Sequence, residues 1–194
     1  MITLKRHLTA WAYQNAWANH RLLTACARLS PQEFAAKRTS FFPSIKATLN
    51  HVVTVDWMYV DAMERMLDGR PPHPAIGEFY DPEEPFDEVI DLAEEQAETD
   101  QRLIAVCERA SDADYERQVA ILRRKGPVEE ELHRLLAHVF EHQIHHRGQA
   151  HAMLAGTSVA PPQLDEFFCA NEADLRAAEF GELGFSEAKI WGGS

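Results

Sequence analysis

Hydrophobic residues recur at helical spacing along four long segments of the chain. In the first segment, apolar and small residues follow one another at intervals of three and four up to about Leu29, which predicts one buried stripe on a long helix. This stripe comprises Leu4, Leu8, Trp11, Asn15, Ala18, Leu22 and Cys26. A second helix is expected from Pro43, which suits a first helical turn, to Gly69, a typical C-terminal stop.

The third and fourth helices are expected in the second half of the chain. The third runs from about Phe86 to Ala110, and the fourth runs from near Pro127 to Ala155, with Gly156 as its stop. Residues 69–85 are rich in Pro and Gly and predict a long surface connection. Residues 111–125 are too short and too mixed in pattern for one element to be assigned, and extended structure is allowed there.

These elements predict an all-α fold. Four long amphipathic helices with one wide connection between the second and third are typical of a four-helix bundle, in which cofactor sites lie between facing helices. After the fourth helix comes a Pro-rich turn, PPQLDEFF, and a weaker helical pattern around EADLRAAEFGEL. We therefore expect a single domain over residues 1–194 with a short C-terminal extension.

Composition narrows the classes of partner. The chain has 19 Lys+Arg against 31 Asp+Glu, a formal net charge of -12, which would repel nucleic acids and anionic membranes. No apolar run reaches the length of a membrane span. Cys26, Cys107 and Cys169 are odd in number and lack CxxC spacing, which favours a reducing cytoplasm over a disulfide framework.

Five of the ten histidines lie in one stretch of the fourth helix, HVFEHQIHHRGQAH. Since each helical residue advances by about 100°, His138, His142 and His146 lie within an arc of roughly 80°. Leu135 and Met153 share that arc, so this face should point into the bundle. His145 lies close to the same face, whereas His151 is expected at the helix end.

The second helix carries one inward histidine, His51, amid apolar residues. Alone it would be read as a core histidine bonded to a neighbouring acceptor. Together with the inward pair His142 and His146 it predicts a site for a divalent metal, because imidazole suits Zn, Ni, Cu and Fe. Three protein nitrogens with an open fourth position are typical of a catalytic metal site.

Several motifs carry a family resemblance: NAWANHRLL in the first helix, FFPSIKATLNHVVTVDWMY in the second, HVFEHQIHHRGQ in the fourth, and PPQLDEFF after it. The chain resembles the DinB-like (YfiT-like) superfamily of proposed metal-dependent enzymes. The resemblance implies a four-helix bundle in which His51, His142 and His146 hold a divalent metal, Zn or Ni by expectation, beside an open pocket. Where many relatives have Asn before the first of these helix-four histidines, this chain has Glu141.

The superfamily includes transferases that use low-molecular-weight thiols, so the resemblance implies a thiol cosubstrate and a small-molecule substrate. A metal-dependent thiol S-transferase or a hydrolase is the first hypothesis. The second is a non-catalytic stress-response protein that binds a metal or small ligand. Pocket candidates are Asn15, Tyr59 and Gln149, together with Trp11, and His138 and Glu141 are candidates to support the ligands from behind.

Two other kinds of metal site fit the sequence less well. HVFEH, from His138 to His142, fits the H-x-x-E-H pattern of inverted zinc peptidases with Glu141 as base, but it leaves His51 and His146 unexplained. A di-iron site needs Glu-x-x-His on two helices, and the fourth helix holds one copy, ending at His133. Phe140, Ile144 and Trp57 lie off the metal-facing stripe and predict a second apolar surface suited to a homodimer.

Overall fold

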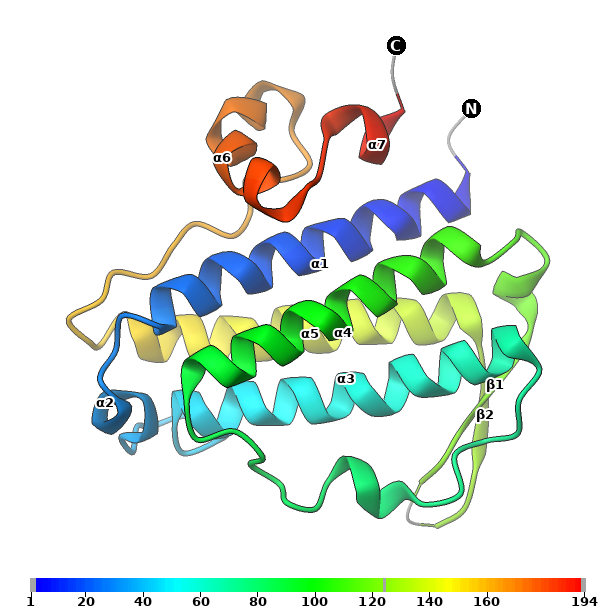
Figure 1. Ribbon diagram of the computed structural model, residues 1–194, viewed down its shortest axis with the longest axis horizontal. Coiled ribbons are helices and arrows are strands. Elements are labelled where there is room, and N and C mark those ends of the chain that lie inside the picture. The colour runs from blue at the N-terminus through cyan, green and yellow to red at the C-terminus, as the bar shows by residue number, and fades with distance from the viewer. Residues whose placement is uncertain (1–2, 124, 193–194) are drawn as a thin grey trace.

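The computed structural model describes residues 3–123 and 125–192 of the chain. Four long helices form a bundle in which α1 contacts α4 and α5, and α3 contacts the same two helices. Their bounds are α1 Leu4–Cys26, α3 Ile45–Asp68, α4 Val89–Arg109 and α5 Leu132–Leu154. The connection after α3 travels back along the bundle, so α3 and α4 run in the same direction, and α5 runs antiparallel to α3 (Figure 1).

Shorter elements complete the fold. A two-stranded antiparallel sheet leans on α3 and α5 beside the ends of the long helices, and two small helices near the C-terminus pack on α1 (Figure 1). The bounds are α2 Pro31–Ala35, β1 Gln118–Ile121, β2 Val128–Glu131, α6 Ala173–Leu183 and α7 Glu187–Trp191, with 3-10 turns at Ile76–Phe79, Asp114–Glu116 and Ala170–Glu172. The expected bundle with its C-terminal extension is confirmed; the extent of a single domain over 1–194 stays a prediction.

The termini of α3 follow from local chemistry. The Ser44 side chain accepts a hydrogen bond from the Ala47 backbone N–H, which satisfies a donor that the first helical turn leaves unpaired. At the other end, Gly69 adopts φ 66°, a left-handed conformation that costs glycine little. The expected start at Pro43 was two residues early, and the expected stop at Gly69 is confirmed.

The beginning of α5 differs from the prediction. Residues 128–131, expected in its first turn, form β2 and pair with β1 in a register that joins Gln118 to Glu131. The Leu132 backbone N–H then donates to the Arg117 carbonyl at 3.0 Å, which extends the ladder into the helix. The pairing partner lies on another segment, so local helical periodicity could not reveal it. The C-cap of α5 is Ala155, one residue before the expected Gly156.

The start of α4 also differs. Phe86, expected in its first turn, instead exchanges two backbone hydrogen bonds with the side-chain amide of Asn50, both at 2.9 Å. These bonds tie the end of the long connection to the first half of α3. The helix consequently begins at Val89.

A buried charge lies at the centre of the bundle. Arg147 of α5 is 3% exposed and donates to the amide oxygens of Asn15 and Asn19 on α1. The nitrogens of the same two amides donate to Asp100 of α4, at 2.9 to 3.0 Å. Each asparagine therefore bridges a cation and a carboxylate, which satisfies groups whose burial would otherwise be costly.

Two glutamines connect the same network to α3, the last of the four long helices. Gln143 accepts from Arg147 at 3.0 Å and donates to Asp56 on α3. Gln96 of α4 donates to Asp56 at 2.9 Å and to Asp100 at 3.2 Å. The network thus joins all four long helices and restricts the rotation of α5 about its own axis.

The two buried carboxyls differ in their proton affinity. Burial, reinforced by the charge of Asp100, raises the pKa of Asp56 to about 8, and burial raises the pKa of Asp100 to about 6. Asp56 Oδ1 has no hydrogen-bond partner among the described residues. A protonated Asp56 leaves Arg147 and Asp100 as a balanced pair at neutral pH, which is the arrangement that burial favours.

This pKa predicts how stability depends on pH. A carboxyl whose folded pKa lies above its unfolded value stabilises the fold at low pH, and that contribution is lost as pH rises from about 4 through about 8. We expect the free energy of unfolding of the natural chain to fall by about 1 kcal/mol or more between pH 6 and pH 9, and Asp56→Asn to remove most of that fall. Urea unfolding followed by circular dichroism measures it. The exposed Asp112→Asn is the control; an equal pH slope in all three proteins would contradict the prediction.

Candidate metal centre

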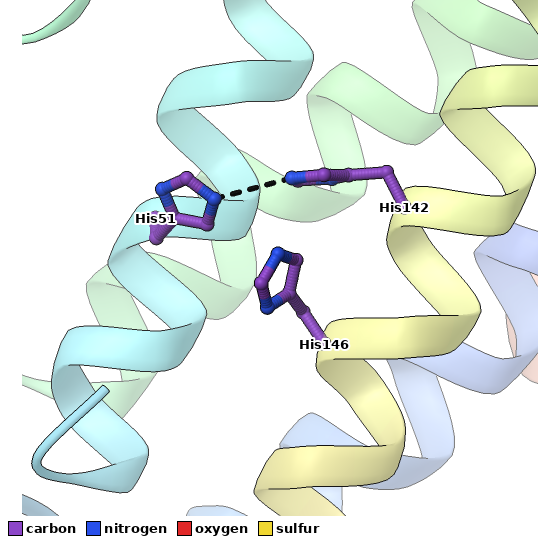
Figure 2. A group of neighbouring side chains, drawn as sticks. All are labelled: His51, His142 and His146. Carbon is purple, nitrogen blue, oxygen red and sulfur yellow. Dashed lines mark hydrogen bonds between the residues drawn. The ribbon is translucent and has the colours of Figure 1, made fainter. Parts of the chain in front are cut away.

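Three imidazoles from two helices converge between α3 and α5. His51 projects from α3, and His142 and His146 project toward it from successive turns of α5 (Figure 2). One nitrogen from each ring lies within 4.8 Å of the other two, and the Nε2 atoms of His51 and His142 are 3.1 Å apart. A tetrahedral zinc with Zn–N bonds of about 2.0–2.1 Å holds its nitrogens roughly 3.4 Å apart, so the cluster has the dimensions of a metal site.

The fold explains why these side chains meet. His142 and His146 are one turn apart and share a face of α5. Gln143 and Arg147, the residues that follow them, are held in the buried network. Because that network restricts the rotation of α5, the two histidines are turned toward α3, where His51 lies opposite them (Figure 2).

Electrostatics keep the imidazoles neutral. Burial, with a smaller effect from His146, lowers the pKa of His51 to about 4. Burial, together with the neighbouring histidines, lowers the pKa of His142 to about 3. Burial also lowers the pKa of His146, against a raising effect of its hydrogen bond to Gln149. Neutral imidazoles with free lone pairs are the form that binds a cation.

Hydrogen bonds orient one of the rings. Gln149 Nε2 lies 3.0 Å from His145 Nε2, and Gln149 Oε1 lies 2.9 Å from His146 Nδ1. With its amide nitrogen donating to His145, the oxygen of Gln149 accepts the Nδ1 proton of His146. This tautomer leaves the His146 Nε2 lone pair for a cation.

The other two rings are held mainly by packing. The Phe42 ring lies over His51, with centroids 4.4 Å apart, and 5.6 Å from His146. The buried Nδ1 of His142 lacks a hydrogen-bond partner within the described part of the chain. A buried nitrogen without a hydrogen-bond partner costs free energy. Hydrogen bonds to the protein therefore do not fully account for the position of the His142 ring.

A cavity of about 490 Å³ adjoins His51. Its walls come from the segment before α3, from α3 itself and from the long connection between α3 and α4. The lining residues are Phe42, Pro43, Ala47, His51, Thr54, Tyr80, Glu83 and Glu84. Its volume suits a small molecule.

The other predicted neighbours take distinct places. His138 lies one turn before His142, with ring centroids 6.3 Å apart, and its Nε2 is 3.1 Å from the hydroxyl of the buried Tyr59. Asn15 has both ends of its amide engaged by Asp100 and Arg147. The expected position of Asn15 in the pocket therefore stays a prediction, and these contacts do not support it. Tyr59 contacts His138, and Gln149 contacts His145 and His146.

Glu141 lies on a different side of α5. It is exposed and lines a groove between α1 and α5 together with Trp11, Phe140 and Ile144. It makes no hydrogen bond or ion pair with any described residue. The cluster contains only one histidine of the H-x-x-E-H pattern, His142, and not His138. The described residues offer no contact for Glu141 as a base or as a support for the ligands.

The second apolar surface has a different composition from the predicted one. Phe140 and the 47%-exposed Ile144 line the α1–α5 groove, as does Leu4, which is 49% exposed and so outside the expected buried stripe. Trp57 instead packs against Phe86 and donates to Glu95 at 2.7 Å. It belongs to the contact between α3 and α4 and not to this groove.

Sequence reasoning missed two neighbours of the site. Phe42 lies within one of the family motifs but is not predicted as a neighbour of the site. An aromatic residue just before a helix with an inward-facing histidine could have suggested a ring contact with His51. Arg123 lies in the loop after β1 and donates to the Tyr59 hydroxyl at 2.6 Å. Nothing in the local pattern of residues 111–125 indicated which helix that loop would meet.

Within the described residues, the helices lack the combination of length and apolar character that crossing a bilayer requires.

Comparisons with known proteins bear on this geometry. A comparison with curated proteins found no match. The model of the DinB family matches residues 4–178, which include all four long helices and the three clustered histidines. The chain therefore belongs to the DinB family.

Proposed function

We propose that His51, His142 and His146 hold a divalent metal ion, zinc or nickel by expectation, and that the protein is a metal-dependent enzyme acting on a small molecule. One observation carries the proposal: three imidazoles whose pKa values are all lowered converge beside a cavity. No fourth His, Cys, Asp or Glu among the described residues joins the group. An incomplete protein shell is typical of catalytic and not structural sites.

A metal on three neutral imidazoles keeps its full charge and can lower the pKa of a coordinated water or thiol to near neutrality. The protein's own residues supply position. Gln149 holds the tautomer of His146, and Phe42 covers His51. The apolar wall formed by Phe42, Pro43 and Ala47 would exclude water from one side of a bound substrate.

The reaction class is transfer of a low-molecular-weight thiol to an electrophile, with hydrolysis as the neighbouring alternative. Family resemblance supports the thiol, and the cavity beside His51 supports a small organic substrate. The residues that touch the cluster offer no carboxylate base among the described part of the chain. A non-catalytic binding protein is the second candidate because no carboxylate of the described residues contacts the three histidines.

Location and assembly complete the proposal. The three cysteines are unpaired, with Cys26 and Cys107 buried and Cys169 exposed, which supports a reducing compartment such as the cytoplasm. The groove of about 460 Å³ between α1 and α5, with exposed Leu4 and Ile144 at its edge, supports a homodimer through this face. Nucleic acid and membrane are not expected partners of a chain with net charge -12.

Metal analysis tests the ligand set. We expect His51→Ala, His142→Ala and His146→Ala each to lower metal affinity by more than the roughly 10- to 100-fold typical of losing an outer-shell partner. His138→Ala should retain the metal because its ring bonds to Tyr59 and is not one of the clustered three. Elemental analysis and competition with a chelator give occupancy and affinity. Full occupancy in His51→Ala and His146→Ala with loss in His138→Ala would favour the inverted peptidase pattern instead.

Gln149 provides a test of ring orientation. In Gln149→Met the acceptor for His146 Nδ1 is lost while the side-chain volume is kept, so metal affinity should fall by about 10- to 100-fold. Gln101→Met, the same substitution at an exposed site on α4, is the matched control. Unchanged affinity in Gln149→Met would mean that packing alone orients His146.

Turnover separates the candidates. The metal-loaded protein should accelerate the addition of a low-molecular-weight thiol to an electrophile, and His142→Ala should reduce that rate to the uncatalysed level. Product formation by liquid chromatography with and without thiol is the measurement. Product formed from an ester without thiol would indicate a hydrolase, and metal binding without either product across a panel of thiols would favour the binding protein.

A further inference from the structure

A cation from outside the bundle reaches the flank of the metal centre. Arg123 lies just after β1, in the hairpin loop, where its backbone N–H donates to the Gly126 carbonyl at 3.2 Å and its carbonyl accepts from the Gly126 N–H at 2.9 Å. Its half-buried side chain extends to α3, and the guanidinium carbon lies 5.2 Å from the centroid of the Tyr59 ring. The reciprocal backbone bonds hold the base of this side chain in place.

The guanidinium has donors to spare. One N–H group donates to the Tyr59 hydroxyl at 2.6 Å, and the remaining N–H groups meet no acceptor on any described residue. The structure likewise pairs Arg123 with no carboxylate within the described ranges, although the chain has 31 acidic residues. A fork of unpaired N–H donors is the group that binds a carboxylate or phosphate oxygen pair.

Tyr59 and His138 connect the Arg123 guanidinium to the candidate metal centre. Because the Tyr59 oxygen accepts from Arg123, its own proton is available to His138 Nε2, 3.1 Å away. His138 would then carry its remaining proton on Nδ1, a second donor on an exposed ring. Since its ring also lies next to His142, with centroids 6.3 Å apart, this donor lies beside the three-histidine cluster, and Arg123 is joined to it through Tyr59.

We propose that Arg123, positioned by Tyr59 and assisted by His138, forms a subsite that binds an oxyanion of the substrate, a carboxylate or a phosphate-like group. The inference rests on the proposed function, because it assigns the substrate's reacting end to the metal centre. A protein of net charge -12 repels anions at long range. An anionic substrate therefore needs a local cation, and within the described ranges Arg123 has contacts that lead through Tyr59 and His138 to His142.

A purely structural role makes different predictions. If Arg123 only attached the hairpin to α3 through its cation–π contact with Tyr59, its replacement would lower stability and leave ligand selectivity unchanged. A measurement of selectivity between matched charged and neutral ligands separates the two roles, because both ligands experience the same loss of stability.

Thiols attached to an acid are suitable probes. In the cobalt-loaded protein, binding of a thiolate to the metal is followed by its sulfur-to-cobalt absorption band. We expect 3-mercaptopropionate to bind about tenfold or more tightly than 3-mercaptopropionamide, its neutral counterpart of equal length. In Arg123→Gln the ratio should fall to about one, with binding of the amide unchanged. Arg123→Lys, which keeps the charge but not the fork, should retain part of the preference.

Control ligands and variants make the test specific. Arg28→Gln removes one positive charge at an exposed position after α1 and should keep the preference of the natural chain. Comparison of 3-mercaptopropionate with 2-mercaptoethanesulfonate tells whether the subsite prefers a planar or a tetrahedral oxyanion. Mercaptoacetate and 4-mercaptobutyrate vary the distance between sulfur and carboxylate.

The outcomes are distinguishable. Equal binding of the acid and the amide by the natural chain, or an unchanged ratio in Arg123→Gln, overturns the subsite while the metal centre stands. An equal loss of the ratio in Arg28→Gln also overturns it, because net charge would then be the cause. Failure of cobalt or of both thiols to bind the natural chain overturns the proposed function and this inference together.

Discussion

The rotation of α5 is the constraint on which the site depends, and Arg147 sets it. Its guanidinium is buried among amides from α1 and α5, and those amides pass hydrogen bonds on to Asp100 and Asp56. Any other rotation would strand a charge in the core, which costs several kcal/mol. Since His146 directly precedes Arg147, fixing the arginine toward the centre also fixes the histidine toward α3.

This arrangement divides α5 into faces with separate tasks. One face holds Gln143 and Arg147 in the polar centre, a second carries His142 and His146, and a third lines the groove with Glu141. Burial of the polar centre is tolerated because each amide is oriented with its oxygen toward the arginine or its nitrogen toward a carboxyl. The same dry surroundings lower the histidine pKa values, so packing and ligand chemistry have a common cause.

Much of this could be predicted from the sequence because it follows from periodicity. Helical spacing places His142 and His146 on one face and His51 on an inward face, and these are the residues that cluster. Periodicity failed where a partner on another segment decided the outcome. Pairing with β1 turned residues 128–131 into a strand, and the Asn50 amide kept Phe86 out of α4. The sequence likewise predicts Asn15 as a pocket residue, because an inward polar side chain does not reveal whether it contacts a ligand or a buried group such as Arg147.

Arg123 is another residue whose contacts the local sequence pattern could not reveal. In the proposed function, it binds the substrate from outside the helices that carry the clustered histidines. The clustered histidines lie on two long helices held by the central network. Arg123 comes from a hairpin that is packed on α3 and α5 and whose described residues make no hydrogen bond to that network. If Arg123 binds the oxyanion as proposed, a substitution in the hairpin would therefore change which ligand charge is favoured without disturbing the geometry of His51, His142 and His146. In the proposed function, rigid helices thus supply the site that needs accurate positions, and a loop supplies the contact that would select among substrates.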